Sequence, residues 1–440
     1  MTPKTFLPAL FAAALLSPAT AQDAPGVESS SDSGPITLIH AGTLLVDADE
    51  APLRERTLVI RDGRIVGLER GFKTDPAAEL IDLSDHFVMP GLIDSHVHLR
   101  GEWSPAQRLD TVTKEPEDYA LDAAHNAMKT LRAGFTAVQD VGGPPAIFAL
   151  KRAVEAGKVP GPHIRASGSA ISPTGGHGDT DGYAKAVLAA FFSDTVCDGV
   201  ADCRRAVRQA VKADADVIKI TATGGVLSNT NAGTEQQFFD DELEAIMQTA
   251  ALMGRKVTAH AHGRGGIEAA VRAGVNSIEH GTYMSESTAR LMRERGVVLV
   301  PTVLAGATVV DWAENYDFLP PNSRRKALEV GPQMVEMLRI AHRAGVTVAF
   351  GTDTGVSRHG LNAQEFRYMR EAGMSAREML ASATKIAAEH IGMADAIGTL
   401  EVGKHADIIA VDASPLDDIT ELEDVDFVMK GGEVFVSPGE

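Results

Sequence analysis

A helix that ends in glycine and passes directly into a β-branched strand recurs along the middle of this chain. Glycine just past a helix adopts the left-handed conformation that ends it, and a basic residue in the last turn suits the helix dipole. The junction occurs four times, at 132–138, 272–278, 294–300 and 343–350. Helices that alternate with single strands in this way predict an α/β fold with a parallel sheet.

The number of such strands indicates which α/β fold the chain adopts. The expected strands are 91–98, 135–141, 163–170, 215–222, 256–262, 275–281, 297–303 and 346–353. Helical stretches that separate them include 116–133, 240–254, 264–273, 285–295 and 329–344. Eight strands alternating with helices within residues 89–396 predict a (β/α)8 TIM barrel. A doubly wound open sheet is the alternative, but no Gly-x-Gly-x-x-Gly motif follows the first strand to support a dinucleotide site.

Both ends of the chain have a different, all-β pattern. Residues 35–88 contain short apolar runs, and Asp62-Gly63 between two of them is a hairpin signal. Residues 397–440 contain a strand and a second hairpin. Each end can therefore form half of a small β-sandwich domain joined around the barrel.

The first residues have the features of an export signal. Residues 1–21 combine Lys4, a short apolar run and the small-x-small sequence Ala19-Thr20-Ala21, which predicts cleavage after Ala21. A disordered or buried amphipathic N-terminus is the alternative. Residues 22–34 are polar and predict a disordered linker. No later segment has about 18 uninterrupted apolar residues, so we expect a periplasmic or secreted protein without a membrane contact after signal removal.

The net charge bears on nucleic acid binding, and the two cysteines bear on a disulfide. The net charge of −19 argues against nucleic acid, because an acidic surface repels phosphate. The two cysteines, Cys197 and Cys203, lie close together, so in an exported protein they are a disulfide candidate. Two free thiols are the alternative, and a pair at this spacing is not by itself a metal site.

Metal-ligand residue types gather where the predicted strands end. Active-site groups of a (β/α)8 barrel lie at the C-terminal ends of its strands. These positions hold His96, His98, Lys219, His260, His262, His280 and Asp353. Each alone could be a satisfied polar residue of the core, but their joint occurrence at one end of the barrel indicates a metal site. Imidazole and carboxylate ligands suit zinc, or manganese, iron or cobalt.

Lys219 is the unusual member of this set. A buried ammonium is costly, and it cannot bind a metal. Reaction with CO2 would convert it to a carbamate, which could bridge two cations. A Schiff-base or salt-bridged lysine is the alternative.

Two longer motifs carry a family resemblance. Residues 90–98 (PGLIDSHVH) and 398–407 (GTLEVGKHAD) resemble the amidohydrolase superfamily, in its binuclear branch with a carboxylated lysine. Residues 219–225, 259–263 and 278–281 are similar to a dipeptidase and carboxypeptidase branch that includes Xaa-Pro dipeptidase-like and ochratoxin-hydrolysing enzymes. The resemblance implies a barrel with a β-sandwich, two divalent metal ions, which we expect to be Zn2+, and a homo-oligomer.

The resemblance also implies roles for the strand-end residues. His96 and His98 would hold the first metal, and His260 and His280 the second. Lys219, as N6-carboxylysine, would bridge both. Asp353 would touch the first metal and act as the catalytic general base. His262 competes with His260 for one ligand position, and the resemblance favours His260.

The expected reaction is hydrolysis of an amide or peptide bond. Two cations that share a water lower its pKa, so that hydroxide is available near neutral pH. The expected substrates are small molecules, namely dipeptides or N-acyl amino acids from which the C-terminal residue is released, with ochratoxin A as a candidate. A cyclic amide, lactone or imidazolone hydrolase is one alternative, although the imidazolone hydrolases of the superfamily that this sequence resembles have one metal and no bridging lysine. A non-catalytic binding protein is the other.

Substrate contacts are less constrained by the sequence. The candidates are His177, His262, Tyr283 and Arg358. His177 lies among glycines after the third strand, where a plain turn is the alternative. Arg358 could bind a substrate carboxylate or be a solvated loop residue. The stretch 180–205 is long enough to form a lid.

Overall fold

The computed structural model describes residues 34–191, 193–229 and 233–439. The expected export signal, 1–21, and all but the last residue of the expected linker, 22–34, lie outside the described residues. Within the described part of the chain, no helix has both the length and the apolar composition needed to cross a membrane.

The two ends of the chain build one sheet together. Its seven strands have the order β14-β13-β12-β4-β1-β2-β3. Their bounds are β1 (Ile36–Leu44), β2 (Leu53–Arg61), β3 (Arg64–Arg70), β4 (Glu79–Pro90), β12 (Ile408–Val411), β13 (Phe427–Lys430) and β14 (Glu433–Val436). The sheet curls, so that Arg64 on β3 forms a bridge with His405. The expected sandwich is thus only partly visible, because the strands form one continuous sheet instead of two.

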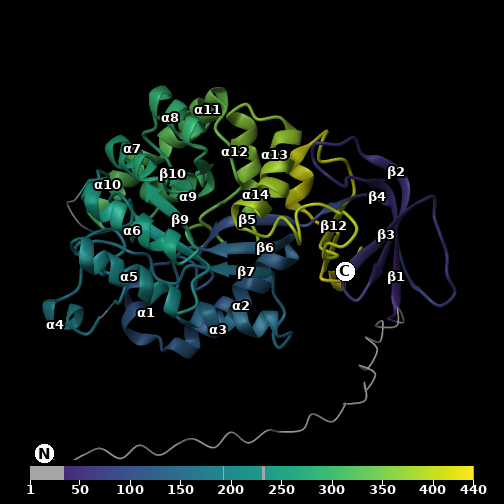
Figure 1. Ribbon diagram of the computed structural model, residues 1–440, viewed down its shortest axis with the longest axis horizontal. Coiled ribbons are helices and arrows are strands. Elements are labelled where there is room, and N and C mark those ends of the chain that lie inside the picture. The colour runs from purple at the N-terminus through teal and green to yellow at the C-terminus, as the bar shows by residue number, and fades with distance from the viewer. Residues whose placement is uncertain (1–33, 192, 230–232, 440) are drawn as a thin grey trace, which may run out of the picture. The chain divides into compact units, whose positions relative to one another are not determined.

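Parallel strands fill the middle of the chain, as expected. They form a three-stranded sheet, β5 (Leu92–Val97), β6 (Phe135–Asp140) and β7 (His163–Ala166), and a four-stranded sheet, β8 (Val217–Thr221), β9 (Lys256–Ala261), β10 (Ser277–His280) and β11 (Val298–Val300) (Figure 1). Single parallel bridges join Ile171 to Ile220, Leu299 to Val348 and Val97 to Thr354. Within the eighth expected strand, 346–353, only Val348 forms such a bridge, so the structure shows two linked parallel sheets and not a barrel with continuous ladders.

Fourteen α-helices accompany these strands within the described residues. They are α1 (Gln107–Thr113), α2 (Pro116–Arg132), α3 (Ala146–Glu155), α4 (Lys185–Leu188), α5 (Val200–Lys212), α6 (Asp240–Leu252), α7 (Arg264–Ala273), α8 (Glu286–Arg295), α9 (Val303–Asn315), α10 (Pro321–Val330), α11 (Met334–Ala344), α12 (Glu365–Glu371), α13 (Ala376–Ala383) and α14 (Lys385–His390). Gly274, Gly296 and Gly345 end their helices in the left-handed conformation, as the junction motif predicts. The expected helix 329–344 is wrong as a single element. A 3-10 turn at Gly331–Gln333 divides it, because Pro332 has no amide proton to donate.

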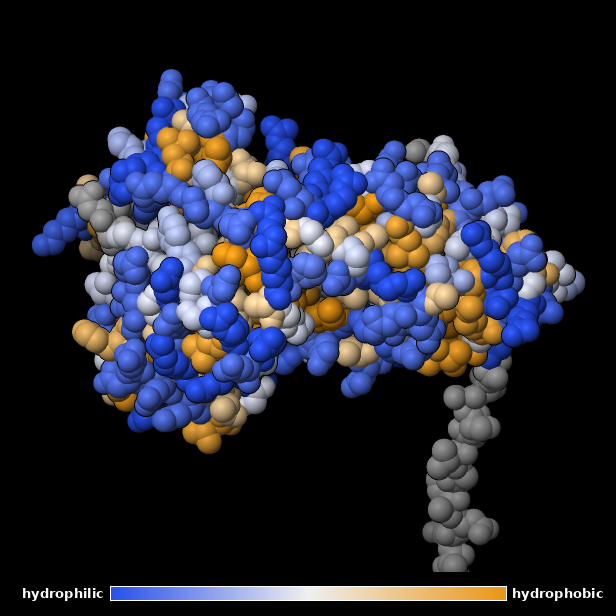
Figure 2. All heavy atoms as spheres, turned by 90° about the horizontal axis from the view of Figure 1, so that it is seen from above, coloured by the Kyte–Doolittle hydropathy of each residue, from blue (hydrophilic) through white to orange (hydrophobic). Residues whose placement is uncertain are grey.

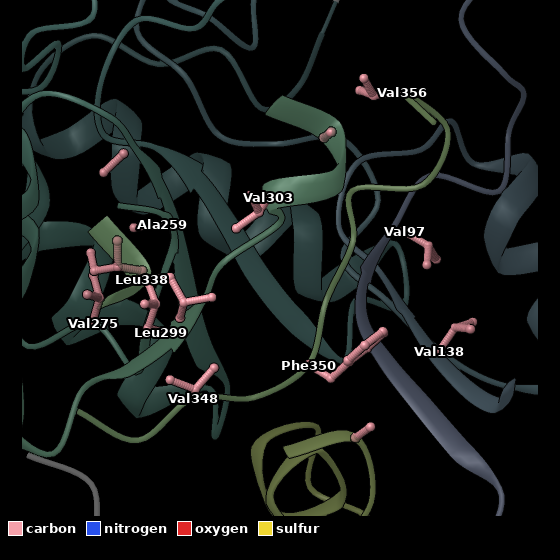
Figure 3. Close-up of a cluster of buried hydrophobic side chains, with 14 of the residues drawn as sticks. Val97, Val138, Ala259, Val275, Leu299, Val303, Leu338, Val348, Phe350 and Val356 are labelled. Carbon is pink, nitrogen blue, oxygen red and sulfur yellow. The ribbon is translucent and has the colours of Figure 1, made fainter. Parts of the chain in front are cut away.

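The core lies between the parallel strands and the helices around them. Every residue of β5, β6 and β8 is buried, as expected for strands covered on both faces. Figure 3 shows Val97, Phe350 and Val303 among the buried apolar side chains. Phe350 also stacks between Phe135 and Phe366, with ring centroids 5.5 and 4.5 Å away. The face in Figure 2 is mostly hydrophilic, with small hydrophobic patches.

Candidate metal centre

Three of the predicted ligands meet where β5 and the 346–353 segment end. One carboxylate oxygen of Asp353, Oδ1, lies 3.1 Å from His98 Nε2 and 3.5 Å from His96 Nε2. This oxygen is buried and has no hydrogen-bond partner within the described residues. The alternation of side chains along β5 places both imidazoles on the same face. A buried carboxylate oxygen facing two imidazole nitrogens is a donor set that fits a divalent cation.

A second group of imidazoles lies beside the first. His260, His262 and His280 each offer a nitrogen within 4.8 Å of the others. The ring of His280 also lies 5.2 Å from that of His96, so the two groups adjoin. Burial lowers the pKa of His262 to about 3 and holds the pKa values of His260 and His280 well below their ordinary range. These imidazoles are therefore neutral at pH 7, which is the form that binds metals.

Lys219 on β8 faces the same space. Its side chain is 5% exposed, and its Nζ has no hydrogen-bond partner in the described part of the chain. Burial lowers its pKa, while Glu279 and Asp353 act in the opposite direction. A buried amine without a hydrogen bond is unfavourable as it stands, since desolvation is not repaid. A carbamate at this position would remove the positive charge and add two oxygen ligands, so this residue too fits a pair of cations.

The rings are held by hydrogen bonds to the nitrogen that faces away from the cluster. His96 Nδ1 lies 2.7 Å from Glu279 Oε2, His98 Nδ1 lies 3.0 Å from the Gly142 carbonyl, and His280 Nδ1 lies 2.7 Å from Thr302 Oγ1. Partners of this kind fix the orientation of metal-binding imidazoles and leave the other nitrogen free. Sequence reasoning missed Glu279 and Thr302, although Glu279 directly precedes His280.

The backbone is strained at the same place. Six residues other than glycine have a positive φ in the described chain, and three of them are His280 (69°), Thr302 (52°) and Asp353 (56°). Such conformations cost about 1–3 kcal/mol each and tend to occur at functional sites. The strain turns two predicted ligands, and the threonine that holds one of them, toward the cluster.

The predicted ligands line one cavity of about 1290 Å³. His177 and Arg358 line it as well, and the ring of His177 lies 4.3 Å from that of His260. Tyr283 does not line it. It lies in a separate pocket of about 190 Å³ with Met337, because the chain turns at Gly281, which has a positive φ (68°). The prediction that Tyr283 contacts the substrate is therefore not supported.

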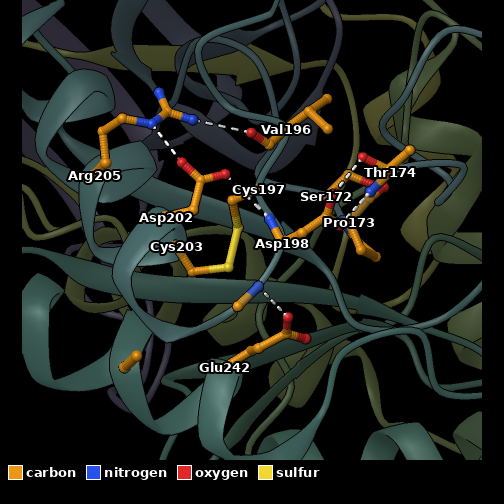
Figure 4. Close-up of a disulfide and its surroundings, with 12 residues drawn as sticks. Ser172, Pro173, Thr174, Val196, Cys197, Asp198, Asp202, Cys203, Arg205 and Glu242 are labelled. Atoms are coloured by element: carbon orange, nitrogen blue, oxygen red, sulfur yellow. Dashed lines mark hydrogen bonds and ion pairs between the residues drawn. A yellow bond between two sulfur atoms is a disulfide. The ribbon is translucent and has the colours of Figure 1, made fainter.

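The expected lid stretch borders this cavity and carries the cysteines. Thr180, Asp181 and Tyr183 of this stretch line the cavity. Cys197 and Cys203 form a disulfide between the end of this stretch and α5 (Figure 4). The Glu242 side chain accepts a hydrogen bond of 2.6 Å from the amide of Gly199, inside the disulfide loop. These contacts attach the lid stretch to α5 and α6.

A sequence model of the Amidohydrolase family matches residues 87–435, which is most of the chain. The chain belongs to the amidohydrolase family. Its relatives include the ochratoxinase of Aspergillus niger, 34% identical over 95% of this chain and 90% of that protein. This amidohydrolase is accordingly a hydrolase that acts on amide bonds.

Solved structures agree with this placement. A Xaa-Pro dipeptidase with methionine bound in its active site is 40% identical, with a TM-score of 0.86 over 91% of this chain and 99% of that chain. A prolidase complexed with N-methylphosphonate-L-proline is 35% identical, with a TM-score of 0.83 over the same shares. The fold of this amidohydrolase is therefore similar to that of enzymes named for cleaving peptide bonds.

Proposed function

We propose that this amidohydrolase releases the C-terminal residue of dipeptides or N-acyl amino acids, and that ochratoxin A is among the amides it can hydrolyse. The observation that carries the proposal is the convergence of five imidazoles, one carboxylate and Lys219 in one cavity, where the lysine Nζ has no hydrogen-bond partner among the described residues. The names of its relatives support the substrate class, since they include an ochratoxinase and a Xaa-Pro dipeptidase.

The proposed metal assignment follows the two groups of ligands. His96, His98 and Asp353 would hold one cation, and His260 and His280 the other. Lys219, carboxylated by CO2, would bridge both. Zinc is the proposed metal, on the basis of imidazole-rich ligands. Two such cations, when bound, lower the pKa of a water molecule and polarise the amide carbonyl.

The chain's own groups would handle the proton. Asp353 would accept the proton of the attacking water and deliver it to the leaving nitrogen, because an amine leaves poorly without protonation. His262 Nδ1 lies 2.8 Å from Thr282 Oγ1. When Thr282 donates that hydrogen bond, the opposite nitrogen carries the proton and can donate to the carbonyl oxygen as negative charge develops. In the same proposal, His177 contacts the substrate and the exposed Arg358 binds its carboxylate.

A substrate panel tests the proposal. Zinc-loaded enzyme is assayed with dipeptides, N-acyl amino acids, ochratoxin A, lactones and cyclic imides. We expect turnover of linear amides with release of the C-terminal amino acid. Turnover of lactones or cyclic imides without any linear amide would refute the proposed substrate class and favour the alternative reaction on the same fold.

Two further properties are proposals of their own. We propose export to the periplasm or medium with cleavage after Ala21, on the basis of the sequence signal alone. N-terminal sequencing of protein recovered from the producing cells tests it. We also propose a homo-oligomer, which light scattering coupled to size-exclusion chromatography tests.

A further inference from the structure

Aromatic side chains form one wall of the catalytic cavity. The wall consists of Trp103, Trp312, Tyr316 and Phe318, all of which line the cavity. Ring centroids lie 6.5 Å apart for Trp103 and Trp312, and 5.4 Å apart for Trp312 and Phe318. Both tryptophans of the whole chain are in this wall. Aromatic rings exposed in a cavity bind large apolar groups.

Helix α9 runs from the proposed metal centre to the aromatic wall, and its length gives the distance from Thr302 to Trp312. Thr302, just before its first residue, contacts His280. Leu304, Val309 and Trp312 follow on the side of α9 that lines the cavity. At 1.5 Å per residue, Trp312 lies about 15 Å along the helix from Thr302. The Trp312 end of the wall is therefore separated from Thr302 by about the length of four residues of extended chain.

This distance decides which side of the amide reaches Trp312. The amino acid released in the proposed function is a single residue, whose side chain is too short to span it. The acyl side has no such limit. The cavity, at about 1290 Å³, also exceeds the roughly 300–1,000 Å³ usual for small-molecule sites, so a dipeptide would leave much of it empty.

We infer that this amidohydrolase prefers N-acyl amino acids whose acyl group is long and apolar and lies along α9 against the aromatic wall. The inference rests on the proposed function and names its substrate class. Helix α9 adds little charge to the cavity lining, which agrees with an apolar acyl group lying along it. Asp311 is the one carboxylate that the helix adds to the cavity lining in the described structure, and it is exposed and bonded to Asn315. A free α-ammonium group placed against the wall would instead lose its hydration.

Chain-length kinetics test the inference. N-acetyl and N-tetradecanoyl derivatives of the amino acid that the panel releases fastest are compared, because a tetradecanoyl chain is long enough to reach Trp312. We expect kcat/KM at least tenfold higher for the tetradecanoyl substrate. Trp312→Ala should lower kcat/KM about tenfold or more for the tetradecanoyl substrate and less than about threefold for the acetyl substrate. Phe239→Ala, which removes an aromatic ring that is 75% exposed outside the cavity, is the matched control and should change neither.

Tryptophan fluorescence gives a second measurement that does not depend on turnover. Since both tryptophans lie in the wall, the whole signal reports on this part of the cavity. Tetradecanoate should shift or quench the emission in a saturable way, and acetate should not. If Trp312→Ala fails to fold, Trp312→Phe keeps a ring at the position and Phe318→Ala tests the neighbouring one.

The outcomes separate the two proposals. Equal kcat/KM for acetyl and tetradecanoyl substrates, with no fluorescence response to tetradecanoate, overturns the inference and leaves the proposed function standing. Absence of turnover for every linear amide overturns both. A chain-length preference that survives Trp312→Ala and Phe318→Ala also overturns the inference, because the acyl group then lies elsewhere.

Discussion

Replacing Glu279 by glutamine should weaken metal binding without touching a ligand. Glu279 is 0% exposed. One of its oxygens lies 2.7 Å from His96 Nδ1, and the other accepts hydrogen bonds from Ser277, at 2.9 Å, and from Thr258. The carboxylate thus serves three donors and leaves the opposite nitrogen of His96, Nε2, unprotonated toward Asp353.

The size of the effect follows from the geometry of the amide. In Glu279→Gln one oxygen becomes an NH2 group, which must face either His96 or the two hydroxyls. Facing His96, it can be accommodated only if the imidazole moves its proton to Nε2, the nitrogen proposed to bind the metal. Facing the hydroxyls, the NH2 group takes away the oxygen to which Thr258 and Ser277 both donate. A buried hydroxyl donor is then left unpaired, at a cost of about 1–3 kcal/mol. Loss of such a supporting partner lowers metal affinity about 10- to 100-fold.

Competition with a chromophoric chelator measures the effect. We expect the zinc affinity of Glu279→Gln to fall at least about tenfold, with kcat recovering at high zinc concentration. Glu242→Gln is the matched control. Glu242 is also buried and accepts two backbone hydrogen bonds, from Gly199 and Phe239, but it does not line the cavity. If both variants keep the wild-type zinc affinity, the argument from the tautomer of His96 is wrong.

Three other changes give distinct results. Lys219→Ala should lower the bound zinc from two ions to one per chain and reduce kcat/KM more than about 100-fold, as measured by elemental analysis and kinetics. Gly225→Ala should raise KM, because its Cβ would lie 2.2 Å from the ring of His177. Hydrogen bonds from Ser375 lower the pKa of Glu378 from 4.5 to about 2, so this residue stabilises the fold above pH 4.5 and ceases to do so as the pH falls toward 2. Urea unfolding should therefore show that Glu378→Gln loses less stability than the wild type between about pH 5 and about pH 3.

Each of these three predictions has a control variant or an outcome that would contradict it. A fully active Lys219→Ala enzyme with two zinc ions would rule out the bridging lysine. Gly101→Ala is the control for Gly225, since nothing lies within 4 Å of its Cβ and KM should not change. An identical loss of stability in acid for wild type and Glu378→Gln would show that the hydrogen bonds from Ser375 do not hold that carboxyl ionised.

Local patterns predicted most of the elements, and the candidate ligands that they indicated lie together in one cavity. Strand alternation placed His96 and His98 on one face, and the helix–glycine junctions appear at Gly274, Gly296 and Gly345. What local patterns could not supply depends on which strands become neighbours. The pairing of both chain ends into one curled sheet is an example, because no residue in either end specifies its partner strand.

The dependence on three-dimensional neighbours also explains why one site residue was predicted wrongly and why two others were missed. Tyr283 lies three residues after His280, but the left-handed turn at Gly281 sends it to another pocket. Thr302 and Glu279 support ligands through contacts between different strands, which sequence spacing does not reveal. The position of the aromatic wall likewise depends on α9, which follows a strand of only three residues.

The shared sheet also sets the order in which the molecule can be completed. β4 pairs with β1 close to it in sequence, but its other edge pairs with β12, where Ile408 lies opposite Pro90. Most of the described chain lies between those two residues, so this edge has no partner until the last strands emerge from the ribosome. Until then its unpaired amide and carbonyl groups are open to pairing with other chains. Loss of β12–β14 should therefore leave this edge of β4 unpaired and the chain prone to aggregation, even though every proposed metal ligand is retained.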